Sequence, residues 1–463
     1  MIFSSPLFLF IFLPIVLAVY YLLPRKFRNG FLLAANLVFY GWGEPVFILL
    51  MVASIVANYL FGLAIEKFPV RKKTMLVLSV LVNLGLLGFF KYTNFFARIF
   101  LSIPGFEGIG LPEILLPIGI SFYTFQAMSY VIDVYRGDVE AQHNLVTFGT
   151  YVSLFPQLIA GPIVRYKDVA EQLEYRRENL KQFSDGIKLF LVGLAKKVLI
   201  ANQMGLLWDM LKNTPGENGI LGSWVGIAAF TLQIYFDFSG YSDMACGLGK
   251  MFGFEFMKNF NYPYISKSIT EFWRRWHISL STWFRDYVYI PLGGNRKGTA
   301  RLILNLLIVW SLTGFWHGAD YNFIMWGVYY FAILVLEKFL LDRPLHKLPG
   351  VVTHTYAMFF IMIGWTIFSF EDLGAMGAYF TSMFSVGGAG LIGADAASAA
   401  LSFLPVIAVG IAASLPVWKA MYYRFQNKKW MLGAEVAIVA GVLVLCTAAL
   451  VSETYNPFLY FRF

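Results

Sequence analysis

The sequence predicts an all-α polytopic integral membrane protein, with about eleven transmembrane helices plus re-entrant and interfacial helices. Charged residues are 14% of the 463 residues, and the apolar set is 58%. Soluble globular chains carry roughly 25% charged residues, and so few charges cannot cover a water-soluble fold of this size. The composition therefore excludes an ordinary cytosolic enzyme, a disordered chain and a nucleic-acid-binding protein, and indicates a chain that crosses a membrane several times.

The apolar run that ends at Leu23 is expected to be a retained first span. No Lys or Arg precedes it, and Pro24, Arg25 and Lys26 follow it. A secretory signal would carry positive charge before its apolar run. Because positive charge stays on the cytoplasmic side of a membrane, the N-terminus is expected outside.

The remaining spans are predicted from apolar stretches, which lie at about 31–42, 46–66, 74–97, 115–135, 146–160, 186–208, 222–249, 301–316, 321–341, 352–370, 401–418 and 430–451. A helix needs roughly 20 residues to cross the hydrocarbon layer. The stretches 31–42, 146–160 and 301–316 are short for this, so tilted, broken or re-entrant segments are expected there.

Basic residues sort by loop and set the expected topology. The stretch from Lys250 to Arg301 holds nine Lys or Arg against three acids, whereas 371–418 holds no Lys or Arg. Placing the basic loops in the cytoplasm gives a self-consistent alternation. The segment 371–400, rich in Gly, Ala and Ser, is then expected to be a long loop outside the membrane.

Two acids, Asp237 and Asp243, lie inside the apolar stretch 222–249. An ionisable residue at membrane depth is a functional candidate, because burying it costs about 2.5–3.5 kcal/mol. Their spacing puts the acids on different faces of a helix, which argues against a carboxylate pair. The favoured interpretation is structural: each acid joins neighbouring helices by hydrogen bonds or pairs with an Arg of the next loop.

The segment 261–295 is basic, aromatic and amphipathic at once. Arg274, Arg275 and Arg285 interleave with Trp276 and other aromatic residues. One interpretation is an interfacial helix, with tryptophans at headgroup level and arginines on lipid phosphates. The other is a wall of a buried site that binds an anionic cofactor from the cytoplasm. Composition alone leaves both open.

Histidines are rare in this chain, and two of the five lie in unusual places. His317 sits where two apolar stretches meet, between Gly314 and Gly318, and His277 lies in the basic aromatic segment. A buried histidine can be a catalyst or a satisfied structural group, and both readings remain open on this evidence. No metal site is expected, because the chain has no zinc-binding His pattern and Cys246 and Cys446 stand alone.

The sequence resembles the membrane-bound O-acyltransferase (MBOAT) family, and within it the bacterial alginate O-acetyltransferase branch. The resemblance covers residues 1 to about 340 and rests on the motifs Lys91-Tyr-Thr-Asn-Phe-Phe96, Leu116-Pro-Ile-Gly-Ile-Ser-Phe-Tyr-Thr-Phe125, Phe155-Pro-Gln-Leu-Ile-Ala-Gly-Pro-Ile163, Tyr235-Phe-Asp-Phe-Ser-Gly-Tyr-Ser-Asp243, Ser268-Ile-Thr-Glu-Phe-Trp-Arg-Arg-Trp-His-Ile-Ser-Leu-Ser-Thr-Trp-Phe-Arg-Asp-Tyr287, Tyr289-Ile-Pro-Leu-Gly-Gly-Asn-Arg296 and Thr313-Gly-Phe-Trp-His-Gly-Ala319. It implies one MBOAT-like transmembrane domain over 1–463, with its motif-bearing core at about 115–340.

The resemblance also implies a function and a site. A cytoplasmic acyl thioester such as acetyl-CoA would donate the acyl group, with no tightly bound cofactor. The acceptor side would be extracytoplasmic, and a secreted or periplasmic acetyltransferase would pass the group to a polysaccharide. His317 matches the catalytic histidine of the family and His277 its second position. Arg274, Arg275, Arg285 and Trp276 are the candidate donor-binding residues, since a basic face attracts a phosphate-bearing donor. Such a protein would lie in a bacterial inner membrane.

Two classes of function fit the composition and topology. The first is the acyltransferase, with His317 as a base that deprotonates the acceptor hydroxyl. The second is a transporter or flippase for a glycan or lipid intermediate, in which the same polar residues line a path. The paired histidines and the basic aromatic segment favour the enzyme, and the chain shows no inverted repeat of the kind found in transporters.

Cysteines introduced at Ser385 and Ser268 test the predicted topology. A membrane-impermeant thiol reagent should label them from opposite faces, because Ser385 lies in a segment without Lys or Arg and Ser268 in the stretch with nine. The measurement is labelling in right-side-out and inverted vesicles. Labelling of both positions from the same face would contradict the topology.

Overall fold

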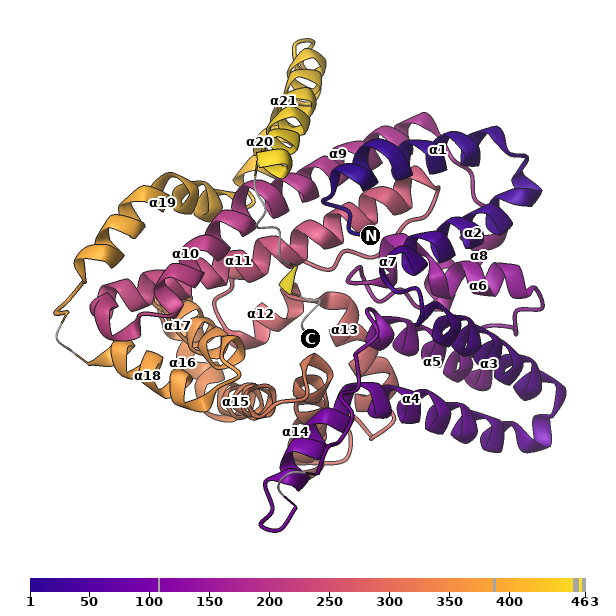
Figure 1. Cartoon of the computed structure of the whole chain (residues 1–463), viewed down its shortest axis with the longest axis horizontal. Helices are drawn as coiled ribbons and strands as arrows, with labels where there is room; N and C mark the ends of the chain where they lie inside the picture. The colour runs from indigo at the N-terminus through magenta and orange to yellow at the C-terminus, as the bar shows by residue number, and fades with distance from the viewer. Residues whose placement is uncertain (107–108, 386–388, 453–457, 460–463) are drawn as a thin grey trace. The chain divides into compact units, whose positions relative to one another are not determined.

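The computed structural model describes residues 1–106, 109–385, 389–452 and 458–459 (Figure 1). Over this part of the chain the regular structure is helical, without strands. Nine described helices are long and apolar enough to cross a membrane. They span Ile48–Lys67, Pro69–Leu101, Leu180–Lys212, Pro215–Met251, Thr299–His317, Tyr321–Lys347, Gly350–Ser369, Ala394–Ala413 and Met431–Ser452. The all-α polytopic fold class predicted from composition is confirmed.

Three expected spans form shorter or more polar helices. The first apolar run gives α1 (Leu13–Leu22), which follows a π-helical turn. The stretch 31–42 lies within α2 (Arg25–Gly43), whose first turn is basic, and 115–135 gives α5 (Ile120–Arg136) of 17 residues. Together with the stretch 146–160, these are the four of the thirteen apolar stretches that give none of the nine long apolar helices described, where about eleven spans are expected.

The chain divides into two compact units, Met1–Phe190 with Ser242–Met257, and Leu191–Tyr241 with Lys258–Phe463. In the first unit, α3 packs beside both α4 and α5 (Figure 1). The stretch 146–160 is broken, as its length predicts, because Pro156 cannot donate a backbone hydrogen bond to a continuing helix. The remaining helices of this unit are α3 (Ile48–Lys67), α4 (Lys72–Leu101), α6 (Leu145–Ser153), α7 (Phe155–Leu158) and α8 (Tyr166–Glu174).

Glu178, which lies shortly after α8, connects to α1 and α2 within the first unit. Its Oε1 accepts a hydrogen bond from the Tyr20 hydroxyl at 2.6 Å and lies 2.7 Å from an Arg28 nitrogen. Burial alone would raise the pKa of the Glu178 carboxyl, but the bonds from Tyr20 and Arg28 outweigh burial and lower it. One ionised carboxylate thus holds α1 and α2 against the segment that follows α8.

The second unit contains the two candidate histidines, His277 and His317. Two helices, α9 (Leu180–Ala195) and α11 (Pro215–Met251), continue from one unit into the other along the chain. The other helices of the second unit are α10 (Asn202–Lys212), α12 (Ile269–Arg275), α13 (Ile278–Phe284), α14 (Thr299–His317), α15 (Tyr321–Leu336), α16 (Asp342–Lys347), α17 (Gly350–Ser369), α18 (Leu373–Phe384), α19 (Ala394–Ala413), α20 (Val417–Phe425) and α21 (Met431–Ser452).

The prediction that 371–400 is a long loop is wrong over much of its length. Helix α18 occupies Leu373–Phe384, and α19 begins at Ala394. Asp372 starts α18, because its side chain accepts a hydrogen bond from the Ala375 N–H. Met376, Tyr379 and Met383 then form a buried stripe at helical spacing. Residues 386–388 of the expected loop lie outside the described residues.

Helices α14 and α15 pack with their backbones in close approach (Figure 1). A Cβ on Gly314 would collide with the Phe323 carbonyl oxygen, and a Cβ on Gly327 would lie 2.5 Å from the Trp310 carbonyl oxygen. Small residues allow this approach between membrane helices. The stretch 301–316, where a tilted, broken or re-entrant segment is expected, lies in one 19-residue helix that is apolar enough to span.

The short helix α12 begins inside the protein. Glu337, which follows α15, is 4% exposed. Its carboxylate accepts hydrogen bonds from the N–H groups of Ile269 and Thr270 at 2.6 and 2.8 Å. The Thr270 and Tyr356 hydroxyls donate to the same carboxylate. The first N–H groups of a helix have no partner within the helix, so this carboxylate satisfies them.

Replacing Glu337 tests its role at the start of α12. Glu337→Ala leaves two helix N–H groups without acceptors and should destabilise the folded protein by about 2–5 kcal/mol. Glu337→Gln keeps one acceptor oxygen and should lose less. The measurement is thermal unfolding in detergent, with the exposed neighbour variant Lys338→Ala as the control. An unchanged melting temperature for Glu337→Ala would contradict the role.

Candidate active site

His317 is the last residue of α14 and is 3% exposed. Aromatic rings surround its imidazole: Trp316 and Trp326 at centroid distances of 5.0 Å, and Phe368 of α17 at 5.4 Å. Gly318 continues the chain in an extended conformation, and a Cβ there would collide with the Phe323 ring. The glycines beside this histidine therefore allow close packing, as their positions in the sequence indicate.

His277 lies between α12 and α13 and is 1% exposed. Its backbone is left-handed, with φ 44° and ψ 54°, which is rare for a residue other than glycine. Such strain costs about 1–3 kcal/mol and persists only where the surroundings impose it. Here Asn259 does so: its carbonyl oxygen accepts from the Ile278 N–H, and its Oδ1 accepts from Ser279.

The structure brings the two histidines into contact with the same tryptophan. The Trp316 ring lies 5.7 Å from the His277 ring and 5.0 Å from the His317 ring. The pKa of His277 is lowered well below its ordinary value, chiefly because burial disfavours the charged imidazolium and also because of His317. A neutral imidazole at neutral pH can accept a proton or orient a neighbouring group.

An aromatic wall encloses this pair. Trp276 is 1% exposed and packs on Phe272 and Trp365, at 5.5 and 4.9 Å between ring centroids. The adjoining Trp273 packs edge-on against Trp310 of α14 at 4.9 Å. Of the two readings of the basic aromatic segment, this burial favours a wall of an interior site, because an interfacial helix would hold its tryptophans at headgroup level.

The four candidate donor-binding residues do not come together. Trp276 lies in the interior, whereas the Arg274 and Arg285 side chains are exposed. Arg285 pairs with Asp286 at 2.8 Å. Arg275 bonds Glu271 and the Asn261 carbonyl oxygen, which ties α12 to the preceding loop. Among the described residues, no group of three or more His, Cys, Asp or Glu side chains is placed to hold a metal.

Asp237 pairs with Lys197 within the membrane domain. The Lys197 Nζ lies 2.6 Å from Asp237 Oδ1, and both side chains are almost fully buried. The Leu459 N–H donates to Asp237 Oδ2 at 2.9 Å. The structural interpretation of Asp237 is thus supported, but its partner is a lysine of the preceding helical stretch rather than an arginine of the next loop. Asp243 is half-buried.

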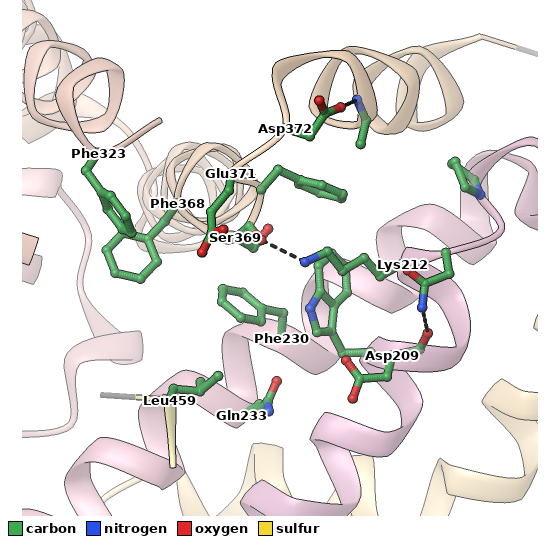
Figure 2. A pocket seen from close by; sticks show the side chains of 15 residues that line it. Asp209, Lys212, Phe230, Gln233, Phe323, Phe368, Ser369, Glu371, Asp372 and Leu459 are labelled. Carbon is green, nitrogen blue, oxygen red and sulfur yellow. Dashed lines mark hydrogen bonds between the residues drawn. The ribbon is translucent and has the colours of Figure 1, made fainter. Parts of the chain in front are cut away.

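A cavity of about 430 Å³ lies next to the residues that surround His317, and Figure 2 shows the side chains that line it. Phe368 belongs both to its wall and to the ring contacts of His317. Phe323, also in the wall, packs edge-on against Phe368 at 5.1 Å. The other lining residues come from α10, α11, α17, α18, the segments that connect them, and Leu459: Trp208, Asp209, Lys212, Asn213, Pro215, Phe230, Gln233, Ser369, Phe370, Glu371, Asp372, Ala375 and Leu459.

Sequence reasoning missed Lys197, Glu337 and Gln233. Each lies in a stretch identified as apolar, so the rule that selected Asp237 could also have selected the two charged residues. Their partners could not be found in this way, because Glu337 bonds to Ile269, 68 residues away. Gln233 is uncharged, and no sequence signal separates it from an ordinary structural amide.

The fold and the site define a polytopic membrane protein with two histidines buried in an aromatic interior, suited to group transfer shielded from bulk water. The chain belongs to the membrane-bound O-acyltransferase family, whose profile matches residues 138–370, and it is an O-acyltransferase.

Similar curated proteins cover most of the chain. The Pseudomonas putida protein named "Probable alginate O-acetylase AlgI" is 42% identical over 491 aligned residues, covering 100% of both chains. The protein of that name from Pseudomonas aeruginosa is 48% identical, over 84% of this chain and 75% of its own. The peptidoglycan O-acetyltransferase of Helicobacter pylori is 34% identical, over 81% and 78%.

The Lys197–Asp237 pair predicts a sharp difference between single and double variants. Asp237→Asn still accepts from the Leu459 N–H but leaves the Lys197 charge buried alone, so stability should fall by about 3–5 kcal/mol. Lys197→Met with Asp237→Leu removes both charges and should recover most of this loss. The measurement is thermal unfolding in detergent. Equal stability of Asp237→Asn and the parent would contradict the pairing.

Proposed function

We propose that this O-acyltransferase moves an acetyl group from a cytoplasmic thioester, such as acetyl-CoA, to a hydroxyl on the other side of the membrane, for O-acetylation of a polysaccharide. The observation that carries the proposal is the pair of buried histidines that both pack against Trp316. The names of the similar proteins support a cell-envelope or secreted polysaccharide as the final acceptor.

The chemistry needs a base and a dry site. His317 takes the proton from the acceptor hydroxyl as its oxygen attacks the thioester carbonyl carbon. The carbon–sulfur bond then breaks, the thiolate leaves and accepts that proton, and an ester remains. His277, neutral because of burial, orients His317 or stabilises charge that develops beside it. The aromatic wall excludes water, which would otherwise hydrolyse the thioester.

The proposed orientation places the basic segment in the cytoplasm and the cavity outside. His354, near the first turn of α17, contacts the Ser266 carbonyl oxygen at 3.2 Å. Ser369, at the last turn of α17, accepts from Lys212 at the cavity. Because the two residues are 15 positions apart on one helix and a helix rises about 1.5 Å per residue, the two places lie roughly 22 Å apart along α17, which is most of the hydrocarbon thickness. The N-terminus is then outside a bacterial inner membrane.

The donor and the partner follow from this orientation. Arg274 and Arg285, exposed on the proposed cytoplasmic side, would attract the phosphates of the donor, whereas Arg275 and Trp276 hold α12 in place. A secreted or periplasmic acetyltransferase would receive the acetyl group and pass it to the polysaccharide. The donor therefore meets the basic face, and the acceptor the opposite one.

Substitution of His317 tests the function. His317→Gln keeps a hydrogen-bonding side chain but cannot take a proton, so transfer should fall by about 10²–10⁴-fold with normal membrane insertion. His277→Ala should also reduce transfer. The measurements are polymer acetylation in cells, corrected for inserted protein, and CoA release from labelled acetyl-CoA by purified protein. The exposed His346→Gln variant is the control.

Near-normal transfer by well-inserted His317→Gln would remove His317 from the mechanism. Poor insertion of both histidine variants, with normal activity in the molecules that fold, would instead assign the histidines a structural role.

A further inference from the structure

Another cavity, of about 850 Å³, lies within the first unit where α2 begins. We call it the α2 cavity. Its walls come from the first two turns of α2, the start of α6 and the end of α8. Helix α2 packs beside α6, and α6 packs beside α8 (Figure 1). No step of the proposed acyl transfer uses this cavity.

The α2 cavity presents two basic side chains without a partner in the protein. Arg25 and Lys26 form the first turn of α2, and both are exposed. Among the described residues, neither makes a hydrogen bond or an ion pair, and the Lys26 Nζ lies 5.0 Å from the centroid of the Phe27 ring. Arg28, in the next turn, is already bound to Glu178. Arg25 and Lys26 can therefore bind an anion together.

The surroundings keep the α2 cavity positive. Among the described lining residues Glu174 is the one acid, and its Oε1 accepts a hydrogen bond from Gln142 Nε2 at 3.4 Å. The first turn of α2 contains no acid, and both α2 and α6 begin at the cavity. The N-terminal ends of helices carry partial positive charge, so they add to the potential of the two basic side chains.

The cavity lies where α2 changes from basic to apolar. Three of the first four residues of α2 are Lys or Arg, whereas Phe31 begins an apolar run. Basic helix ends of this kind lie at the level of the lipid headgroups. On the apolar side, Phe27 and Val146 line the cavity and are 54% and 41% exposed. An occupant must therefore combine an anionic head with an apolar body, which inorganic phosphate does not.

Gly30 keeps a groove open between α2 and α6. The residue lines the cavity and is exposed. A Cβ on Gly30 would have one neighbour within 4 Å, the Val146 Cγ1 atom at 3.9 Å. A larger side chain at this position would thus stand in open space and fill the groove. Because glycine weakens the interior of a helix, its presence here has a cost in stability that the groove could explain.

We propose that the α2 cavity binds one anionic phospholipid, with its phosphate on Arg25 and Lys26 and an acyl chain in the groove over Gly30. Basic pockets between membrane helices bind lipid headgroups of this charge. The bound lipid fills the space between α2 and α6 and so stabilises the first unit. This site is separate from the proposed acyl transfer and does not depend on it.

Lipid binding is measured on the delipidated full-length protein in detergent. The probes are dioleoylphosphatidylglycerol, which is anionic, and dioleoylphosphatidylcholine, which is not. The anionic lipid should raise the melting temperature in a saturable way, and native mass spectrometry should show one retained molecule. The zwitterionic lipid should do neither at the same concentration. Inorganic phosphate and CoA serve as soluble anions and should not reproduce the effect.

Charge variants test the basic side chains. Arg25→Gln with Lys26→Gln should weaken binding of the anionic lipid about thirtyfold, because each basic residue near a membrane surface contributes about fivefold. The matched control, Arg71→Gln with Lys73→Gln, removes the same charge from exposed residues outside the cavity lining and should leave the affinity unchanged. Glu174→Gln removes the acid of the lining and should tighten binding severalfold.

Gly30→Leu separates a lipid site from a generally basic surface, because it fills the groove without changing the charge. Binding of the anionic lipid should fall at least about tenfold. The melting temperature without lipid should be unchanged or higher, since leucine favours a helix more than glycine does.

Four outcomes would overturn the proposal. The first is an equal effect of the two lipids on the parent protein. The second is the same loss of affinity in the Arg71 and Lys73 control as in the Arg25 and Lys26 variant. The third is undiminished binding by Gly30→Leu. The fourth is stabilisation by CoA or inorganic phosphate that Arg25→Gln with Lys26→Gln removes, which would make the cavity a site for a soluble anion.

Discussion

Every backbone polar group kept away from water must find its partner inside the protein, and this constraint governs the centre of the second unit. A helix that begins in the interior has unsatisfied N–H groups at its start, where water cannot bond to them. Glu337 supplies both acceptor oxygens that α12 needs there. With its first turn satisfied, a helix of seven residues can lie among buried tryptophans and end directly before His277.

The two histidines are held by different means. His317 ends a long helix whose partner is fixed by glycine contacts, so the backbone of the whole α14–α15 pair defines its place. His277 has no helix of its own and takes a strained conformation imposed by Asn259. Both rings are packed among aromatic side chains, and burial favours the neutral form of the His277 imidazole. Packing thus fixes the position of His317, whereas the position of His277 also depends on the hydrogen bonds of Asn259.

Much of the helical framework could be predicted from the sequence, because a run of about 20 apolar residues has few alternatives in a membrane. The break within 146–160 agrees with its shortness, and the close packing at Gly314 and Gly318 could be predicted for equally local reasons. The Gly and Ala content of the α18 segment predicts a loop. The helical spacing of Met376, Tyr379 and Met383 is the signal that would have predicted the helix. Pairings such as Lys197 with Asp237 join residues far apart in sequence, and spacing carries no information about them.

Close contact between α14 and α15 has a mechanical consequence. Where the carbonyl oxygens of one helix lie against the glycine Cα atoms of the other, neither helix can slide along its neighbour without a collision of main-chain atoms. His317, the last residue of α14, is therefore held against movement along the helix axis by main-chain contacts, which cannot repack as side chains can.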